Sequence, residues 1–286
     1  VLRKLTGLPI LGVIPKMKDP SPVQVARHLQ LGSLFKTSTN GAARSSQTQR
    51  LARIDQKQIW HPFTQQADWE QEEPLIIESA QGVWLQDTRG RQYLDGVSSL
   101  WVNLHGHRHP ALDQALKRQL ERIAHSTLLG ASNVPSIELA QALIEVAPKN
   151  LTRVFYSDSG STAVEIALKM AFQYWHQNGQ PSRRKFVHFV DAYHGDTVGS
   201  VSVGGIELFH RVYGPLLFKG FKLPSPSNQK PARRSFKSLK EILRKHHRAI
   251  AGVVVEPLVQ GASGILVQPK GWLKQVERLC RQYDVF

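Results

Sequence analysis

The sequence predicts an α/β fold whose parallel sheet is covered by helices on both faces. Three apolar runs carry this prediction, at residues 154–156, 186–190 and 250–255. Amphipathic helical patterns separate these runs, and near-continuous apolar strands alternating with helices are typical of parallel sheets. In such a sheet, ligands bind outside the carboxyl ends of the strands.

The amino-terminal 53 residues are predicted to form two segments. Residues 1–31 contain an apolar run closed by Pro15 and then a short helical pattern, which indicates a small α/β remnant. Residues 32–53 are rich in Gly, Ser, Thr, Asn and Gln and have no acidic residue, which predicts a linker. The span 21–54 also shares its composition with a mitochondrial transit peptide, but its internal position favours a linker.

The next hundred residues begin the segment 54–286, which we expect to form the main folded part. Segments 82–90 and 91–96 alternate in polarity and meet at Arg89-Gly90, which predicts a hairpin. A helix is predicted to begin at Pro110 and a second at Pro135, because each proline precedes apolar residues at helical spacing.

Three further helices are predicted in the carboxyl-terminal half. One presents an apolar face from Ala163 to Tyr174 and ends at Gly179, a residue favoured just beyond a helix. The second covers residues 239–248 and follows a basic loop, and the third runs from about Trp272 to Tyr283.

The composition is that of a globular protein, with 286 residues of which 41% are hydrophobic. The net charge of +15 comes from residues 1–57, with ten Lys and Arg against two Asp, and from residues 230–248, with eight against one Glu. The remainder is balanced, which disfavours a nucleic-acid-binding surface, although a basic nucleic-acid-binding protein stays an alternative.

The single cysteine, Cys280, cannot form an internal disulfide, and no run approaches about 20 apolar residues. We therefore expect no membrane span and a cytoplasmic protein, or a mitochondrial one in a eukaryote. No metal site is expected, because Arg108 and the turn-like spacing of the three histidines at 105–109 do not suit a zinc site.

The first predicted strand is followed by Ser157-Asp-Ser-Gly-Ser-Thr162, which leads directly into a helix. Free N–H groups at a helix N-terminus favour an anion, and Gly160 allows its close approach to the backbone. The alternative is a Ser/Thr helix cap with a turn glycine, and the segment alone favours that reading.

The other two strand ends carry polar segments of a similar kind. Asp191-Ala-Tyr-His-Gly-Asp-Thr197 follows the second strand and suits a planar ring stacked on Tyr193, with a tight surface turn as the alternative. Glu256-Pro-Leu-Val-Gln-Gly261 follows the third strand and places a carboxylate there, which either contacts a ligand or orients its neighbours.

Six motifs in order give the sequence a resemblance to a known family. They are Ile59-Trp-His-Pro-Phe-Thr64, Leu94-Asp-Gly-Val-Ser-Ser-Leu-Trp101, Leu104-His-Gly106, Asp158-Ser-Gly-Ser-Thr-Ala163, Tyr193-His-Gly-Asp-Thr197 and Val254-Val-Glu-Pro-Leu-Val-Gln-Gly-Ala262. Residues 54–286 resemble the amino-terminal portion of the pyridoxal-phosphate-dependent class III aminotransferases of biotin synthesis. The resemblance implies fold type I, and residues 54–286 would be the amino-terminal part of its large domain.

The resemblance also implies roles for particular residues. Gly160 and Ser161 would hold the phosphate of pyridoxal 5′-phosphate, and Tyr193 would stack on its ring and line the substrate pocket. Glu256 would join the polar network around the ring, with Asp196 supporting the same turn. Residues Phe63, Leu100 and Trp101 would lie in the substrate cleft. The sequence departs from the family there, since Tyr is expected at position 63 and Trp at position 100.

The implied reaction moves an amino group from S-adenosylmethionine to 8-amino-7-oxononanoate, giving 7,8-diaminononanoate, in a homodimer. Another class III omega-aminotransferase and a non-catalytic relative remain alternatives. The Schiff-base lysine of the family matches no position here, so no catalytic residue is assigned and we expect an inactive fragment. Residues 5–15 resemble the carboxyl-terminal end of dethiobiotin synthetase, which implies a fragment of a fused bifunctional enzyme.

Overall fold

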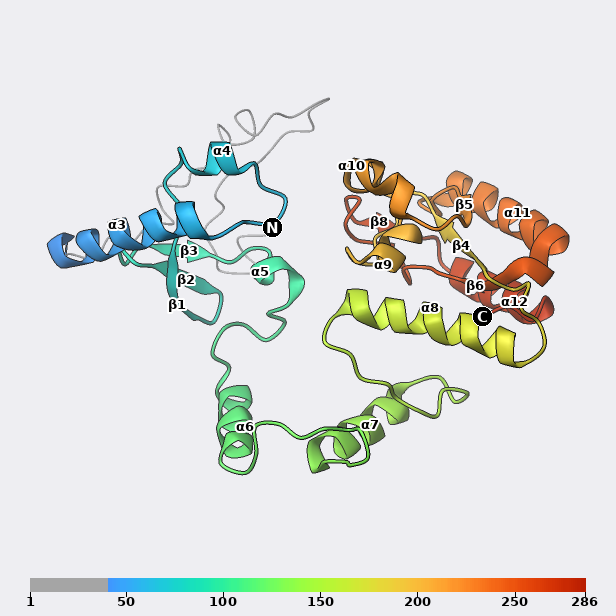
Figure 1. Cartoon of the computed structure of the whole chain (residues 1–286), viewed down its shortest axis with the longest axis horizontal. Helices are drawn as coiled ribbons and strands as arrows, with labels where there is room; N and C mark the ends of the chain where they lie inside the picture. The colour runs from blue at the N-terminus through green and yellow to red at the C-terminus, as the bar shows by residue number, and fades with distance from the viewer. Residues whose placement is uncertain (1–40) are drawn as a thin grey trace, which may run out of the picture. The chain divides into compact units, whose positions relative to one another are not determined.

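The computed structural model describes residues 41–286, which form two compact units that divide after Asn133 (Figure 1). The strand, the helix and the dethiobiotin synthetase-like tail expected in residues 1–31 lie outside the described residues. Each unit is described by itself below. Within residues 41–286, no helix combines the length and the apolar character needed to cross a membrane.

The first unit begins with a helix where a linker was predicted. Helix α3 covers Gly41–Gln58, so the part of the linker prediction that falls on residues 41–53 is wrong about local structure. The helix also belongs to the folded unit, because Thr48 Oγ1 donates to Thr88 Oγ1 at 2.8 Å in a buried contact. Its residues are mostly polar and form no apolar stripe, so no hydrophobic periodicity marks this helix in the sequence.

The predicted hairpin is confirmed and belongs to a three-stranded antiparallel sheet, in which β1 (Ile77–Gln81) adds to β2 (Trp84–Asp87) and β3 (Gln92–Leu94). Asp87 fixes its turn, because its carboxylate accepts hydrogen bonds from the backbone N–H groups of Arg89 and Arg91. The unit also contains the short helices α4 (Gln66–Trp69) and α5 (Ser98–Trp101) and the predicted helix α6 (Pro110–Leu120).

The second unit contains a parallel sheet, as the sequence predicted, and its strand order is β5-β4-β6, where β5 was not predicted. Its strands are β4 (Lys185–Phe189), β5 (Phe221–Leu223) and β6 (Ile250–Val253). Successive residues of β4 point to opposite faces, so Phe186 packs beneath α8 (Gly160–Gln177) with Leu168 and Trp175. On the other face, Val187 and Phe189 join the core formed with α11 (Gln229–His246) and α12 (Trp272–Gln282).

The remaining elements of the second unit connect this framework, and Figure 1 shows α8 and α12 on either side of β6. They are α7 (Val134–Val146), α9 (Val198–Ser202), α10 (Glu207–His210), the 3₁₀ helices η2 (Arg211–Leu216) and η3 (His247–Ala249), and the short antiparallel pair β7 (Val259–Gln260) and β8 (Leu266–Val267).

Two predictions about this unit are wrong. Residues 154–156 are not a strand, because no neighbouring strand within residues 41–286 pairs with them and Phe155 is exposed. Helix α11 begins ten residues before the predicted Leu239, so the expected basic loop is helical. Ala232, Ser235, Leu239 and Leu243 are buried along one side of it, and its cations lie on the exposed side.

Candidate functional site

A cavity of about 720 Å³ lies in the second unit, between the N-terminus of α8 and the loop that follows β4. Its lining comes from the two strand-end segments that the sequence marked out: Ser159, Gly160, Ser161, Val164, Tyr193, His194, Gly195, Asp196 and Thr197. The cavity therefore lies beyond the carboxyl end of β4, where ligands of parallel sheets bind.

The N-terminus of α8 offers hydrogen-bond donors to this cavity. Ser159 caps the helix in a capping box, in which its hydroxyl accepts from the Thr162 N–H and the Thr162 hydroxyl accepts from the Ser159 N–H. The N–H groups of Gly160 and Ser161, at the first two helical positions, have no acceptor within residues 41–286. The cap reading of the sequence is therefore confirmed, while anion binding stays a prediction for which the next two N–H groups are suitable donors.

The turn after β4 is fitted closely against this helix end. Ser161 Oγ accepts from the Thr197 N–H at 3.0 Å and lies 2.9 Å from Thr197 Oγ1. Gly195 has φ +119°, and a Cβ atom added there would lie 2.3 Å from Ser161 Oγ. Only glycine allows this approach, because both the backbone conformation and the contact exclude a side chain.

Tyr193 is held at the cavity by its own turn. Its hydroxyl donates to Asp196 Oδ2 at 2.5 Å, and desolvation together with this bond raises the pKa of the phenol to about 12. The phenol is therefore neutral at physiological pH, and its ring keeps a fixed place beside the N-terminus of α8. Asp196 supports the same turn in this structure.

Glu256 does not line the cavity but joins the cavity's turn after β4 to the loop after β6. Its carboxylate accepts from the Tyr193 N–H at 3.1 Å and from the Gly261 N–H at 3.0 Å. Burial raises the pKa of Glu256, and these two backbone hydrogen bonds oppose the rise. These contacts agree better with the alternative in which Glu256 orients its neighbours than with the alternative in which it contacts a ligand directly.

His194 also lines the cavity, and the sequence reasoning did not assign it to the site. Its Nε2 atom is buried and has no hydrogen-bond partner within the described residues. Burial lowers the pKa of the imidazole to about 4, and the nearby His188 adds to the effect. The sequence feature that could have identified His194 is the Tyr-His-Gly order, in which the histidine directly follows Tyr193.

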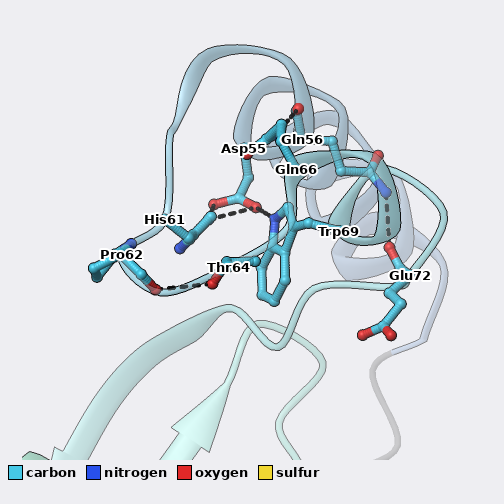
Figure 2. A network of polar contacts seen from close by, with 8 residues as sticks. All are labelled: Asp55, Gln56, His61, Pro62, Thr64, Gln66, Trp69 and Glu72. Atoms are coloured by element: carbon cyan, nitrogen blue, oxygen red, sulfur yellow. Dashed lines mark hydrogen bonds and ion pairs between the residues drawn. The ribbon is translucent and has the colours of Figure 1, made fainter. Parts of the chain in front are cut away.

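The three residues expected in the substrate cleft lie in the first unit. Phe63 is 76% exposed, and the turn around it is held by neighbours (Figure 2). Asp55 accepts from Trp69 Nε1 at 2.8 Å and lies 3.0 Å from His61 Nε2, while the Thr64 hydroxyl donates to the Pro62 carbonyl at 2.9 Å.

Leu100 and Trp101 are exposed on α5 and have φ values of +66° and +68°. Such values are uncommon for residues other than glycine, and here Asp95 braces the preceding residue by accepting from the Ser99 N–H and hydroxyl, each at 2.8 Å. Asp95 also lies 2.7 Å from His107 Nε2, so His107 of the three-histidine loop is part of this brace.

Two other reactive side chains lie outside the cavity. Cys280 is buried in the core of the second unit, and burial raises the pKa of its thiol to about 11. Lys169, on α8, lines a separate, largely apolar cavity with Phe172 and Phe186. The structure thus brings together Gly160, Ser161 and Tyr193, with Glu256 behind Tyr193.

The chain is similar to proteins of known family. Residues 65–286 match the family described as aminotransferase class-III. A relative from Nitratidesulfovibrio vulgaris, named adenosylmethionine-8-amino-7-oxononanoate aminotransferase, is 54% identical over 253 residues, which cover 85% of this chain and 47% of the relative. The chain spans about half the length of the curated relatives it matches.

Solved structures give the same result. The adenosylmethionine-8-amino-7-oxononanoate aminotransferase of Methanocaldococcus jannaschii is 43% identical, with a TM-score of 0.79 over 83% of this chain and 53% of that one. An omega transaminase from Pseudomonas jessenii, in complex with PMP, is 30% identical with a TM-score of 0.77 over 82% of this chain and 54% of that one.

Proposed function

The chain belongs to the class III aminotransferases, and from this premise we propose that the whole protein transfers an amino group from S-adenosylmethionine to 8-amino-7-oxononanoate. The product is 7,8-diaminononanoate, an intermediate of biotin synthesis. The names of the relatives in N. vulgaris and M. jannaschii support this choice of reaction. The observation that carries it is the donor-lined cavity at the N-terminus of α8.

Class III aminotransferases depend on pyridoxal phosphate, which serves as an electron sink when it is bound. The cavity suits its phosphate, because the Gly160 and Ser161 N–H groups and the Ser161 hydroxyl are donors grouped at one helix N-terminus. Among the residues that the structure describes, no Lys or Arg lines this cavity, so backbone dipoles provide most of the attraction for the phosphate charge.

Four residues share the remaining work of the site in this proposal. The Tyr193 ring would cover one face of the cofactor, and Asp196 fixes the ring by accepting from its hydroxyl. Glu256 keeps the loop of Tyr193 in place through the backbone. The imidazole of His194 also lines the cavity, and its buried Nε2 atom has no hydrogen-bond partner within the described residues.

Phe63, Leu100 and Trp101 are proposed as substrate-contacting residues, because of the motifs that contain them. Phe63 lacks the phenol expected there, and Leu100 offers less stacking surface than the expected Trp. These two departures favour a second candidate function, an omega-aminotransferase that takes another amino donor.

The amino donor distinguishes the two candidates. In the native protein purified from its source, we expect S-adenosylmethionine to support formation of 7,8-diaminononanoate, and Phe63→Tyr to raise kcat/KM for this donor. Activity with simple primary amines and none with S-adenosylmethionine contradicts the first candidate and supports the second.

We also propose that the whole protein is a cytoplasmic homodimer. The exposed leucines at 112, 116 and 120 on α6 support the dimer, because exposed apolar patches of this kind are often buried in a subunit interface. Sedimentation of the native protein tests it: a mass of two subunits is expected, and a monomer at micromolar concentration contradicts it.

A further inference from the structure

A triad of hydroxyl groups lies behind the phosphate-facing side of the cavity: Ser161 on α8, and Thr197 and Ser200 at the start of α9. Ser161 Oγ lies 2.9 Å from Thr197 Oγ1 and 3.2 Å from Ser200 Oγ, and the latter two lie 3.1 Å apart. Ser200 is fully buried. At these distances, only a few assignments of donor and acceptor are possible among the three hydroxyl groups.

The protons of the triad can be assigned from the neighbouring backbone groups. A hydroxyl has one proton to donate and two lone pairs that accept. Ser200 donates its proton to the Ser161 carbonyl at 2.9 Å, so within the triad it only accepts. The Thr197 N–H occupies one lone pair of Ser161 Oγ at 3.0 Å. We assign the Thr197 hydroxyl proton to the second lone pair, because that contact is the shorter of its two.

With both lone pairs filled, Ser161 Oγ has only its proton left to offer. Its partner within the protein is Ser200 Oγ at 3.2 Å, the longest contact of the triad. A charged oxygen in the cavity forms a stronger hydrogen bond than a neutral hydroxyl and takes this proton. With this assignment, Ser161 is a donor with or without a ligand, and a ligand group that itself needs an acceptor finds none there.

We propose that Thr197 and Ser200 are positioning residues that make the Ser161 hydroxyl a dedicated hydrogen-bond donor and so select a phosphate-bearing ligand. This inference rests on the proposed function, since it concerns the same cavity. It gives supporting roles to Thr197, the N-cap of α9 that lines the cavity, and to the buried Ser200 of α9. Thr197 acts through its hydroxyl and its N–H, and Ser200 fixes the Ser161 carbonyl.

The test compares a phosphorylated ligand with its unphosphorylated form. Pyridoxine 5′-phosphate and pyridoxine are suitable because neither has an aldehyde that would react with surface lysines. Affinities of the 286-residue chain are measured by calorimetry for the wild type and for Thr197→Val, which keeps the shape and loses the hydroxyl. We expect Thr197→Val to bind the phosphate ester about tenfold more weakly, with pyridoxine affinity unchanged.

Two further variants distinguish a positioning role of the Thr197 hydroxyl from a general structural effect of the substitution. Thr197→Ser keeps the hydroxyl, and we expect it to restore the affinity for the phosphate ester. Ser202→Ala removes another buried hydroxyl of α9, one that donates to the Val198 carbonyl instead of the triad, and it should leave the ratio of the two affinities unchanged. Equal weakening of both ligands in Thr197→Val overturns the inference, as does an unchanged affinity for the phosphate ester.

The failure of the proposed function gives a different result. If the wild-type chain does not prefer pyridoxine 5′-phosphate to pyridoxine, the phosphate site itself is contradicted, and the inference falls with it. If the wild type has this preference and Thr197→Val retains it in full, only the inference is overturned.

Discussion

The backbone nitrogen of Thr197 lies 3.0 Å from the Oγ atom of Ser161, so the turn after β4 is hydrogen-bonded to the N-terminus of α8. Thirty-six residues separate the two positions. Gly199 repeats the connection one helical turn later, because its N–H donates to Glu165 Oε1 at 2.6 Å. The two walls of the cavity are therefore one rigid arrangement, and changes on either wall should affect the other.

Replacing Gly195 by alanine tests the close approach of these walls. The added methyl group meets Ser161 Oγ at 2.3 Å on a backbone with positive φ. We expect Gly195→Ala to lower the free energy of unfolding by about 3 kcal/mol and to abolish the preference for phosphorylated ligands. Thermal and chemical denaturation measure the first effect.

Gly179→Ala is the matched control, because Gly179 also has positive φ, at +73°, but nothing lies within 4 Å of an added Cβ. It should cost only about 1 kcal/mol. Equal losses in the two variants would mean that backbone conformation, and not crowding against Ser161, limits position 195.

Glu256→Gln tests the carboxylate that joins two loops. The amide keeps one acceptor oxygen, so one of the bonds from the Tyr193 and Gly261 N–H groups is lost. We expect a loss of about 1–2 kcal/mol in the free energy of unfolding and weaker binding of pyridoxine 5′-phosphate. Glu241→Gln is the control, since Glu241 is exposed and pairs with Lys245 on the same helix. If both variants are as stable as the wild type, Glu256 does not anchor the loops.

His194 should make stability depend on pH in the acidic range. Its pKa is about 4 in the folded chain, below the ordinary value of 6.5. The contribution of His194 to the free energy of unfolding is therefore fully present above pH 6.5 and is lost as the pH falls through 4. The reason is that the unfolded chain binds the proton at a higher pH than the folded chain does. Burial lowers the pKa of His188 as well, so His194→Gln removes part of the slope.

Nuclear magnetic resonance provides a direct check, since the His194 imidazole should remain neutral to about pH 4. His176→Gln, at an exposed position on α8, controls for the loss of a histidine. An imidazole of His194 that titrates near pH 6.5 contradicts its burial at the cavity.

Tyr193→Phe removes the hydrogen bond to Asp196 and keeps the ring. We expect a loss of about 1 kcal/mol in the free energy of unfolding and a small loss in ligand affinity, because the ring is no longer fixed. In the wild type, the pKa of about 12 means that the stability contributed by the phenol is present below pH 10 and is lost as the pH rises through 12. Denaturation between pH 8 and 11 should show this loss in the wild type and not in the variant.

The sequence predicted the parallel sheet and most of its covering helices because their signals are local. Phe186, Val187 and Phe189 form an apolar run that only His188 interrupts, and α8 and α12 are amphipathic. Strand β5 has only three residues, Phe221–Leu223, which is too short for a period to be visible. Helix α3 was taken for a linker because contacts made by Thr48 and Gln56 with later residues hold it in place.

The site was predicted in part for the same reason. Tyr193 follows the end of β4, and Gly160 and Ser161 begin α8, so local signals in the sequence place all three near one edge of the sheet. The roles of Thr197 and Ser200 depend on distances across 36 and 39 residues, which no local pattern reveals. The indirect role of Glu256 likewise depends on where the turns after β4 and β6 meet.

The central claim is that a phosphate group binds at the first two N–H groups of α8. The most direct measurement follows the backbone amide resonances of the isotopically labelled 286-residue chain during titration with pyridoxine 5′-phosphate. We predict that the amide protons of Gly160 and Ser161 shift downfield together and more than any others, because they gain a charged acceptor. Shifts concentrated on the basic residues of α11, with Gly160 and Ser161 unmoved, would contradict the claim.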